Sequence, residues 1–201
     1  MKNEPIRIGI VGAGNVVRQR YIAGFRALEG VEVVGVCNST GESSERVAAE
    51  YEIARAYGTW LELVEAVDTN AILIGTYADL HCPVTLAALD QGKHVLTETP
   101  VGRSAEEAHA MLEAAKARPD LVAQAIPGAF SYQVDPTVQE LIRDGYLGDL
   151  LAVDMRLHQR SFVDLEGPFH RRNSWEVRGH NAFLLTGWYE CLMRWVGPAK
   201  K

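Results

Sequence analysis

Residues 6–17 read Ile-Arg-Ile-Gly-Ile-Val-Gly-Ala-Gly-Asn-Val-Val, which places an apolar strand directly before a Gly-x-Gly turn. Gly12 can turn the chain tightly, and Gly14 lets the backbone approach a pyrophosphate. A helix starting near Asn15 and Val16 would offer its free N–H groups to the same phosphates. Val17 stands where a third glycine would complete the fingerprint. Strand, turn and helix follow in the required order, so this stretch predicts a dinucleotide-binding site.

The segment after the second predicted strand bears on which dinucleotide binds. Residues 31–37 are strand-like, and Asn38, Ser39 and Thr40 follow them. In dinucleotide-binding folds an acid about 20 residues past the glycines bonds the ribose 2′-hydroxyl of NAD. Here no acid repels a 2′-phosphate, and Arg18 or Arg46 is near enough in sequence to approach one. The segment therefore favours NADP over NAD, although the same residues also suit a plain turn before a helix.

Composition limits the class of protein and its partners. The chain has 201 residues, of which 47% are hydrophobic and 23% charged, with a net charge of -6 and a pI near 5.5. This is typical of a globular protein and argues against nucleic-acid or membrane-surface partners, which favour clustered Lys and Arg. No apolar run approaches the roughly 20 residues of a membrane span. We expect a cytoplasmic protein that acts on a small-molecule substrate.

Cysteine and histidine usage predicts neither disulfides nor metal. Cys37, Cys82 and Cys191 are far apart and odd in number, which is typical of reduced thiols. The six histidines include no pair at helical ligand spacing beside a carboxylate. No metal site is expected.

The order of strands and helices predicts the fold. Strands alternate with helices, which implies parallel pairing through crossovers and hence a doubly wound Rossmann sheet. The expected strands after the first two cover 71–76, 94–98 and 121–126. The expected helices cover 43–53, capped at Ser43 or Ser44, and 60–67, 83–90 and 105–117.

Ligands of such sheets bind at the carboxyl ends of the strands. The residues expected at that edge are Gly12, Asn38, Thr76, Glu98 and Pro127. Glu98 could contact a ribose there or simply cap the following turn near Arg103. Lys93 and His94 open a strand instead, so we expect them at the opposite edge in structural roles.

A second domain is expected from residue 128. It begins with a helix over 136–144 and a strand over 150–157, and a helix over 182–195 follows. The polar segment 160–180 has no strong period, and its arginines Arg171, Arg172 and Arg178 would meet an anion only if they converge. The predicted domains are therefore a dinucleotide-binding domain at 1–127 and a partial α/β domain at 128–201.

The chain resembles the Gfo/Idh/MocA family of NAD(P)-dependent oxidoreductases nearly from end to end. Besides the glycine turn, the resemblance is carried by Gly75-Thr76-Tyr77-Ala78-Asp79-Leu80-His81, by residues 87–100, and by Gly-Tyr-Leu-Gly at 145–148. It implies hydride transfer at a carbinol or carbonyl carbon of a sugar or similar polyol. It also implies that Gly75, Thr76 and His81 lie beside the cofactor.

The chain departs from the family pattern at its catalytic residues. The family's Glu-Lys-Pro motif is Glu98-Thr99-Pro100 here, and threonine replaces the lysine neither as a cation nor as a base. Tyr189 falls near the position of the family's histidine. Tyr189, Glu190 or His180 could therefore transfer the proton. The alternative is an ordinary amphipathic helix that buries its tryptophans, with Tyr189 as a half-buried aromatic.

Family members also continue well past residue 201, so the chain looks truncated, and much of the substrate wall would come from elsewhere. We expect a homo-oligomer, a dimer or higher, because exposed strand edges invite pairing. Three hypotheses remain open: a degenerate NAD(P)-dependent oxidoreductase, a nucleotide-binding or scaffold protein without activity, and a Rossmann fold recruited to a non-redox reaction.

Overall fold

The computed structural model describes residues 4–126, 132–156, 158, 166–171, 174–179 and 183–198. The chain divides into two compact units. The first contains Met1–Pro127 and Trp175–Asn181, and the second contains Gly128–Ser174 and Ala182–Lys201. The segment from Trp175, which the sequence analysis placed in the second domain, therefore belongs with the first unit.

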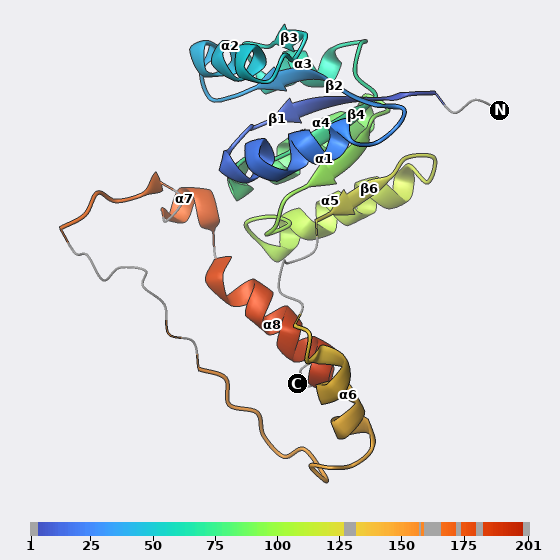
Figure 1. Ribbon diagram of the computed structural model, residues 1–201, viewed down its shortest axis with the longest axis vertical. Helices are drawn as coiled ribbons and strands as arrows, with labels where there is room; N and C mark the ends of the chain where they lie inside the picture. Colours follow the sequence, from blue (N-terminus) through green and yellow to red (C-terminus); the bar gives the residue numbers. More distant parts are fainter. Residues whose placement is uncertain are drawn as a thin grey trace. The chain divides into compact units, whose positions relative to one another are not determined.

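Six parallel strands form one sheet in the first unit, in the order β3-β2-β1-β4-β5-β6 (Figure 1). They are β1 (Ile6–Val11), β2 (Val31–Cys37), β3 (Arg55–Ala56), β4 (Ala71–Ile74), β5 (His94–Thr97) and β6 (Ala123–Ala125). This order is that of a doubly wound dinucleotide-binding sheet, whose switch point lies between β1 and β4. The predicted Rossmann fold is confirmed, while the two-residue β3 was not predicted.

Helices cover both faces of this sheet. They are the π-helical segment η1 (Val17–Tyr21), α1 (Ile22–Arg26), α2 (Gly41–Glu50), α3 (Trp60–Glu65), the 3₁₀ turn η2 (Ala78–Leu80), α4 (His81–Asp90) and α5 (Ala105–Ala117). The short helix α7 (Trp175–Arg178) contacts η2. Because side chains alternate along a strand, β1 sends Ile8 and Ile10 into one core and Val11 into the other. The first core contains buried residues of η1, α1 and α2, and the second contains those of α3 and α4.

Three helices begin where a side-chain hydroxyl caps the backbone. Thr40 Oγ1 accepts from Ser43 N at 3.2 Å, so α2 starts at Gly41 and not at the predicted Ser43 or Ser44. Thr59 caps α3 in a full capping box, and Ser104 caps α5. Such caps satisfy amides that the helix itself leaves unpaired.

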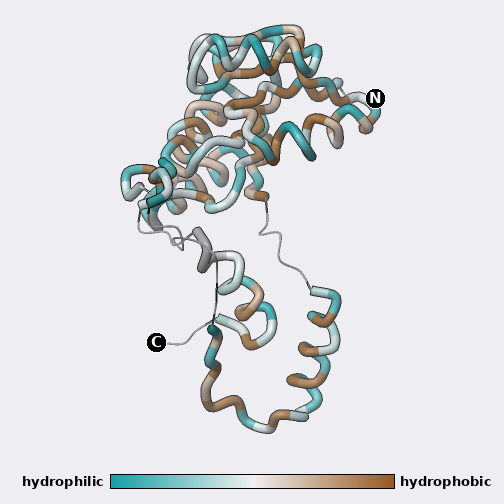
Figure 2. Tube along the Cα trace, turned by 60° about the vertical axis from the view of Figure 1, so that its left-hand side comes forward, coloured by the Kyte–Doolittle hydropathy of each residue, from teal (hydrophilic) through white to brown (hydrophobic). Residues whose placement is uncertain are grey.

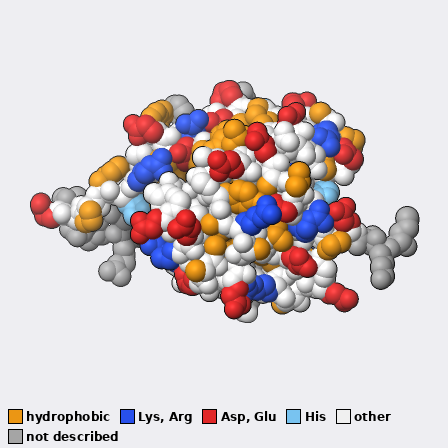
Figure 3. Space-filling view, turned by 90° about the horizontal axis from the view of Figure 1, so that it is seen from above, with side chains coloured by type: hydrophobic (Ala, Val, Ile, Leu, Met, Phe, Trp, Pro, Cys, Tyr) orange, Lys and Arg blue, Asp and Glu red, His pale blue; other side chains and the backbone are white. Residues whose placement is uncertain are grey.

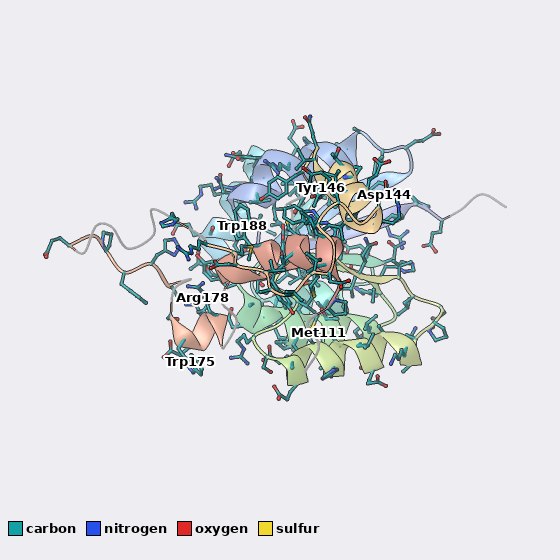
Figure 4. All side chains as sticks on the ribbon, turned by 90° about the horizontal axis from the view of Figure 1, so that it is seen from below. Met111, Asp144, Tyr146, Trp175, Arg178 and Trp188 are labelled. Atoms are coloured by element: carbon teal, nitrogen blue, oxygen red, sulfur yellow. The ribbon has the colours of Figure 1, made fainter. Side chains whose placement is uncertain are left out.

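The second unit contains two long helices, α6 (Asp135–Arg143) and α8 (Phe183–Val196), joined by a buried carboxylate. Asp135 accepts from Trp195 Nε1 at 2.8 Å and from Arg194 Nη2 at 3.1 Å. Although burial opposes it, these bonds and the Tyr132 amide lower the pKa of Asp135. The rings of Tyr132 and Trp188 stack with their centroids 6.1 Å apart. Trp188 is labelled on α8 in Figure 4.

The strand predicted over 150–157 is absent from its described residues. Residues 150–156 have no helix or strand assignment and join no sheet. A strand exists only where a neighbouring strand accepts and donates its backbone hydrogen bonds. The described part of the second unit provides no such neighbour.

The surface carries both signs of charge. On the face shown in Figure 3, acidic and basic side chains are interspersed, and neither sign forms a continuous patch there. Among the described helices, none has the length and apolar character needed to cross a bilayer.

Candidate cofactor and active site

Register brings the predicted edge residues together. In the sheet Val11 pairs with Cys37 and Ile74, and Ile74 pairs with Thr97. The residues that follow these four strands therefore meet at one edge. The carboxyl edge is formed by Gly12, Asn38, Gly75 with Thr76, and Glu98, as the sequence predicted. Pro127 lies outside the described residues.

The glycine turn after β1 fits a phosphate. Gly12 has φ +86°, which a residue with a side chain rarely adopts, and a Cβ there would lie 2.5 Å from Thr76 Cγ2. A Cβ on Gly14 would meet only Gly75 O, at 3.7 Å, so its outer side is open. The first helical hydrogen bond runs from Arg18 N to Gly14 O, at 3.0 Å. The amides of Asn15, Val16 and Val17 precede that bond and carry the positive end of the helix.

Gly75 takes over the packing role of the absent third glycine. Val17 is buried, and a Cβ on Gly75 would lie 2.4 Å from Val17 Cγ2 and 2.6 Å from Gly12 O. Val17 therefore fits because Gly75, which follows the adjacent strand β4, has no side chain. The missing glycine is visible in the sequence, but this compensation is not, because it depends on β4 lying beside β1.

Asn38 holds the glycine turn. Its Oδ1 accepts from Ala13 N at 2.8 Å, and its Nδ2 donates to Ser43 O at 3.1 Å and to Ser43 Oγ at 3.2 Å. The amide side chain thus ties the turn after β1 to the first turn of α2. Ser39 and Thr40 lie beside it and are exposed.

His81 lies under the edge, not on its surface. The side chain is 1% exposed. Nδ1 lies 2.7 Å from Pro100 O, and Nε2 lies 3.1 Å from Thr76 O. His81 thereby joins the loop after β4 to the loop after β5. Its predicted place beside the cofactor stays a prediction, and the geometry makes such a role indirect, through the backbone of Thr76.

Glu98 joins the end of β5 to the glycine-turn helix. Tyr21 Oη donates to Glu98 Oε1, and Thr99 N donates to Oε2 at 3.1 Å. Burial, with the bond to Glu98, raises the pKa of Tyr21 well above its ordinary value. Tyr21 ends the π-helical segment, and such segments often occur at functional sites. The bond from Thr99 N fits the predicted alternative that Glu98 caps the turn after β5, while Arg103 pairs with Glu107 at 2.5 Å.

The proton-transfer candidates lie partly outside the described residues. Tyr189 and Glu190 are on α8 in the second unit, and Tyr189 is 40% exposed. The apolar stripe of α8 packs separately from them, with Cys191 buried and Trp188 against Tyr132. His180 and Arg172 lie outside the described residues. In the part of the chain that the structure describes, no group of His, Cys, Asp and Glu side chains could hold a metal ion.

Lys93 and His94 lie at the amino edge of the sheet. Lys93 Nζ donates to Ala66 O and to Thr69 Oγ1, each at 2.5 Å, and burial lowers its pKa. His94 Nδ1 accepts from Val122 N at 2.9 Å. Both side chains therefore connect loops on the side of the sheet opposite the glycine turn.

A dinucleotide cradle on a doubly wound parallel sheet defines the class of this protein, an NAD(P)-binding Rossmann protein. The family model described as "Oxidoreductase family, NAD-binding Rossmann fold" matches residues 6–125. The chain belongs to this Gfo/Idh/MocA oxidoreductase family.

Curated relatives include several sugar dehydrogenases and reductases. The chain is 36% identical over 110 residues to 1,5-anhydro-D-fructose reductase of Ensifer adhaerens, covering 55% of this chain and 33% of that protein. It is 25% identical over 187 residues to D-glucoside 3-dehydrogenase of Escherichia coli, covering 93% of this chain and 52% of that protein. The chain thus spans about half the length, or less, of these relatives.

Solved structures share the fold. A 3-ketoreductase from Actinomadura kijaniata, in complex with NADP and TDP-benzene, superposes with a TM-score of 0.61 at 23% identity, over 70% of this chain and 43% of that one. A myo-inositol 2-dehydrogenase from Lactobacillus plantarum superposes with a TM-score of 0.60 at 21% identity, over 72% and 42%.

Proposed function

We propose that the chain binds NADP, in preference to NAD, at the carboxyl edge of its sheet. The glycine turn supports this most directly, because Gly14 is open on its outer side while the amides of Asn15, Val16 and Val17 precede the first helical bond. This combination of space and unpaired N–H groups suits a pyrophosphate. A bound nicotinamide dinucleotide supplies hydride chemistry.

The preference for NADP rests on the end of β2. Asn38 is neutral where NAD-binding folds carry an acid, and its carbonyl oxygen already accepts from Ala13. Ser39 and Thr40 are exposed beside it, and Arg46 is exposed and donates to Ser43 Oγ at 3.3 Å. Hydroxyls and a guanidinium are suitable partners for a 2′-phosphate.

Titration with NADPH and NADH tests this proposal, with nucleotide binding followed by tryptophan fluorescence. We expect NADPH to bind more tightly than NADH. In Asn38→Asp the acceptor for Ala13 remains and a negative charge is added, so NADPH should weaken at least tenfold while NADH does not. Asn38→Ala is the matched control, because it removes the acceptor without adding charge and should weaken both nucleotides alike. Failure of both nucleotides to bind at millimolar concentration would refute the proposal.

We further propose that the chain is a dehydrogenase or reductase with a degenerate catalytic site. Its substrates would be sugar-like or other small hydroxy or carbonyl compounds. The names of the relatives support the substrate class. Thr99 stands at the family's lysine position, and loss of a general acid or base lowers rates by about 100-fold to 10,000-fold. Tyr189, Glu190 and His180 are the candidates for proton transfer. Thr99→Lys should raise turnover at least tenfold at unchanged NADPH affinity, and Tyr189→Phe should lower the residual rate if Tyr189 is the donor.

A non-catalytic nucleotide-binding or scaffold protein is the second candidate, and Thr99 is the observation that favours it. Under this function NADPH binds, yet neither the wild type nor Thr99→Lys turns over any substrate in a sugar and polyol panel. The hypothesis of a non-redox reaction has no residue in its favour. The remaining expectations are a homo-oligomer and a cytoplasmic location, which is compatible with three buried free thiols.

A further inference from the structure

Glu98 is held at the end of β5 by two donors that leave its charge intact. Tyr21 Oη donates to Glu98 Oε1, and the backbone amide of Thr99 donates to Oε2 at 3.1 Å. Both donors are neutral, so they orient the carboxylate without cancelling its charge. Burial, together with the bond to Glu98 and the charge of Glu98, raises the pKa of Tyr21, so the phenol keeps its proton and remains a donor.

No cation neutralises this carboxylate in the part of the chain that the structure describes. Arg103, the arginine that follows in the same loop, pairs with Glu107 at 2.5 Å. Arg20 is exposed on η1, so water and salt screen its charge. Thr99 is uncharged where the family pattern has a lysine. The end of β5 therefore keeps a negative charge that no described ion pair cancels.

The surroundings of Glu98 limit the screening of this charge. Glu98 itself is half-buried. Tyr21, Leu96 and Ile126 pack beside it against the first hydrophobic core, and hydrophobic residues recur throughout the first unit in Figure 2. A charge beside apolar side chains acts more strongly on a neighbouring charge than one that is surrounded by water.

The sheet order places Glu98 in the half of the cofactor site that lies opposite Asn38. β2 and β5 flank the central pair β1 and β4, and the glycine turn follows β1. In doubly wound sheets a dinucleotide lies across the switch point, with one nucleotide on each half of the sheet. Because we propose the 2′-phosphate contacts at the end of β2, the nicotinamide half belongs to the side of β4 and β5.

We propose that Glu98 makes this site favour the oxidised nicotinamide, whose ring carries a positive charge, over the reduced nicotinamide, whose ring is neutral. The inference rests on the proposed function, since it concerns the same nucleotide site. A fixed carboxylate attracts the cationic ring and gains nothing comparable from the neutral one. Tighter binding of the oxidised form shifts the bound cofactor towards that form, which suits removal of a hydride from a hydroxyl-bearing carbon.

Calorimetric titration of the full chain with NADP⁺ and with NADPH tests the proposal, and the ratio of the two affinities is the readout. Glu98→Gln removes the charge and can keep both bonds, because an amide oxygen accepts from Thr99 N and an amide nitrogen donates to Tyr21 Oη. The affinity for NADP⁺ relative to NADPH should fall about fivefold or more. Effects on the phosphates, which both nucleotides share, cancel in this ratio.

A second variant and a matched control isolate the charge. Thr99→Lys adds a cation beside Glu98 and leaves the backbone amide of residue 99 in place, so the same ratio should again fall about fivefold or more. Glu65→Gln removes the same charge from the exposed last residue of α3, next to Ala66, which Lys93 contacts at the amino edge. This control should leave the ratio within about twofold of the wild type.

An unchanged ratio in Glu98→Gln would overturn the proposal. Equal weakening of both nucleotides would indicate a contact to a part that they share, such as a ribose, and no weakening would indicate a purely structural cap. An equal fall in Glu65→Gln would also overturn it, because the cause would then be the net charge of the chain.

Thermal unfolding of each variant verifies that it folds, and Thr99→Lys alone decides the matter if Glu98→Gln does not fold. A wild type that binds neither nucleotide would refute the proposed function, and this inference with it. A wild type that binds both nucleotides, with a ratio that neither Glu98→Gln nor Thr99→Lys changes, would refute this inference alone.

Discussion

Gly75→Ala should destabilise the first unit because the new methyl group has no room. Its Cβ would lie 2.4 Å from Val17 Cγ2 and 2.6 Å from Gly12 O, and the second of these is backbone that can move only with the glycine turn. Overpacking of this kind costs about 1–3 kcal/mol. For a unit of this size the melting temperature should fall by roughly 3–15 °C.

Gly14→Ala is the matched control. Its Cβ would meet only Gly75 O at 3.7 Å, so the fold should keep its stability to within about 0.5 kcal/mol. The methyl group would nevertheless occupy the open side of the turn, where we propose the pyrophosphate, and NADPH should bind at least tenfold more weakly. The two glycines therefore separate the packing role from the binding role.

Urea unfolding followed by circular dichroism measures stability, and fluorescence titration measures nucleotide affinity. A second variant pair sharpens the test. Val17→Ala removes the nearer clash, so Gly75→Ala should cost less in that background than in the wild type, with the clash against Gly12 O left over. Unchanged stability of Gly75→Ala, or an equal cost in both backgrounds, would refute the assignment of Gly75 as the compensating glycine.

Three further changes test other contacts. Tyr21→Phe removes the donor to Glu98 and should cost about 1–2 kcal/mol of unfolding free energy in urea titrations; a variant as stable as the wild type would contradict that bond. Lys93→Met removes the donor to the buried Thr69 hydroxyl and to Ala66 O, which keeps its bond from Thr69, and should cost about 1–3 kcal/mol, while NADPH affinity stays within twofold because Lys93 lies at the opposite edge. Burial raises the pKa of Cys37 from 9.0 to about 11, so the unfolded thiol ionises first as the pH rises, and the stability present below pH 9 is lost towards pH 11. Cys37→Ala should lack this loss, about 1–2 kcal/mol, when both proteins are unfolded at pH 8 and at pH 10.5.

Local patterns predicted the sheet well because each crossover unit carries its own signals. The strand before Gly12, the helix over Ala105–Ala117 and the arrangement of the carboxyl edge all follow from periodicity, caps and parallel connectivity. Contacts between distant segments were not predictable in this way. The bond from Tyr21 to Glu98 and the burial of His81 depend on which strands are neighbours, which no local pattern states.

The strand predicted over 150–157 failed although its local pattern was present. Its alternating pattern is genuine, but a strand requires a partner as well as a pattern, and residues 150–156 have none in the described chain. α7, by contrast, was missed because Trp175–Arg178 is a single turn without a detectable period. Its place depends on Arg103, whose Nη1 donates to Glu176 O at 3.2 Å.

The return of α7 to the first unit makes the chain pass between its units three times, after residues 127, 174 and 181. Val177 is 2% exposed, and Gly179, with φ +60°, approaches Arg103 so closely that a Cβ would lie 2.4 Å from Arg103 O. A protease that cuts once between residues 128 and 174 would consequently produce a nicked molecule, because packing of α7 retains the distal piece. Its two fragments would separate on a denaturing gel and migrate together on a native one.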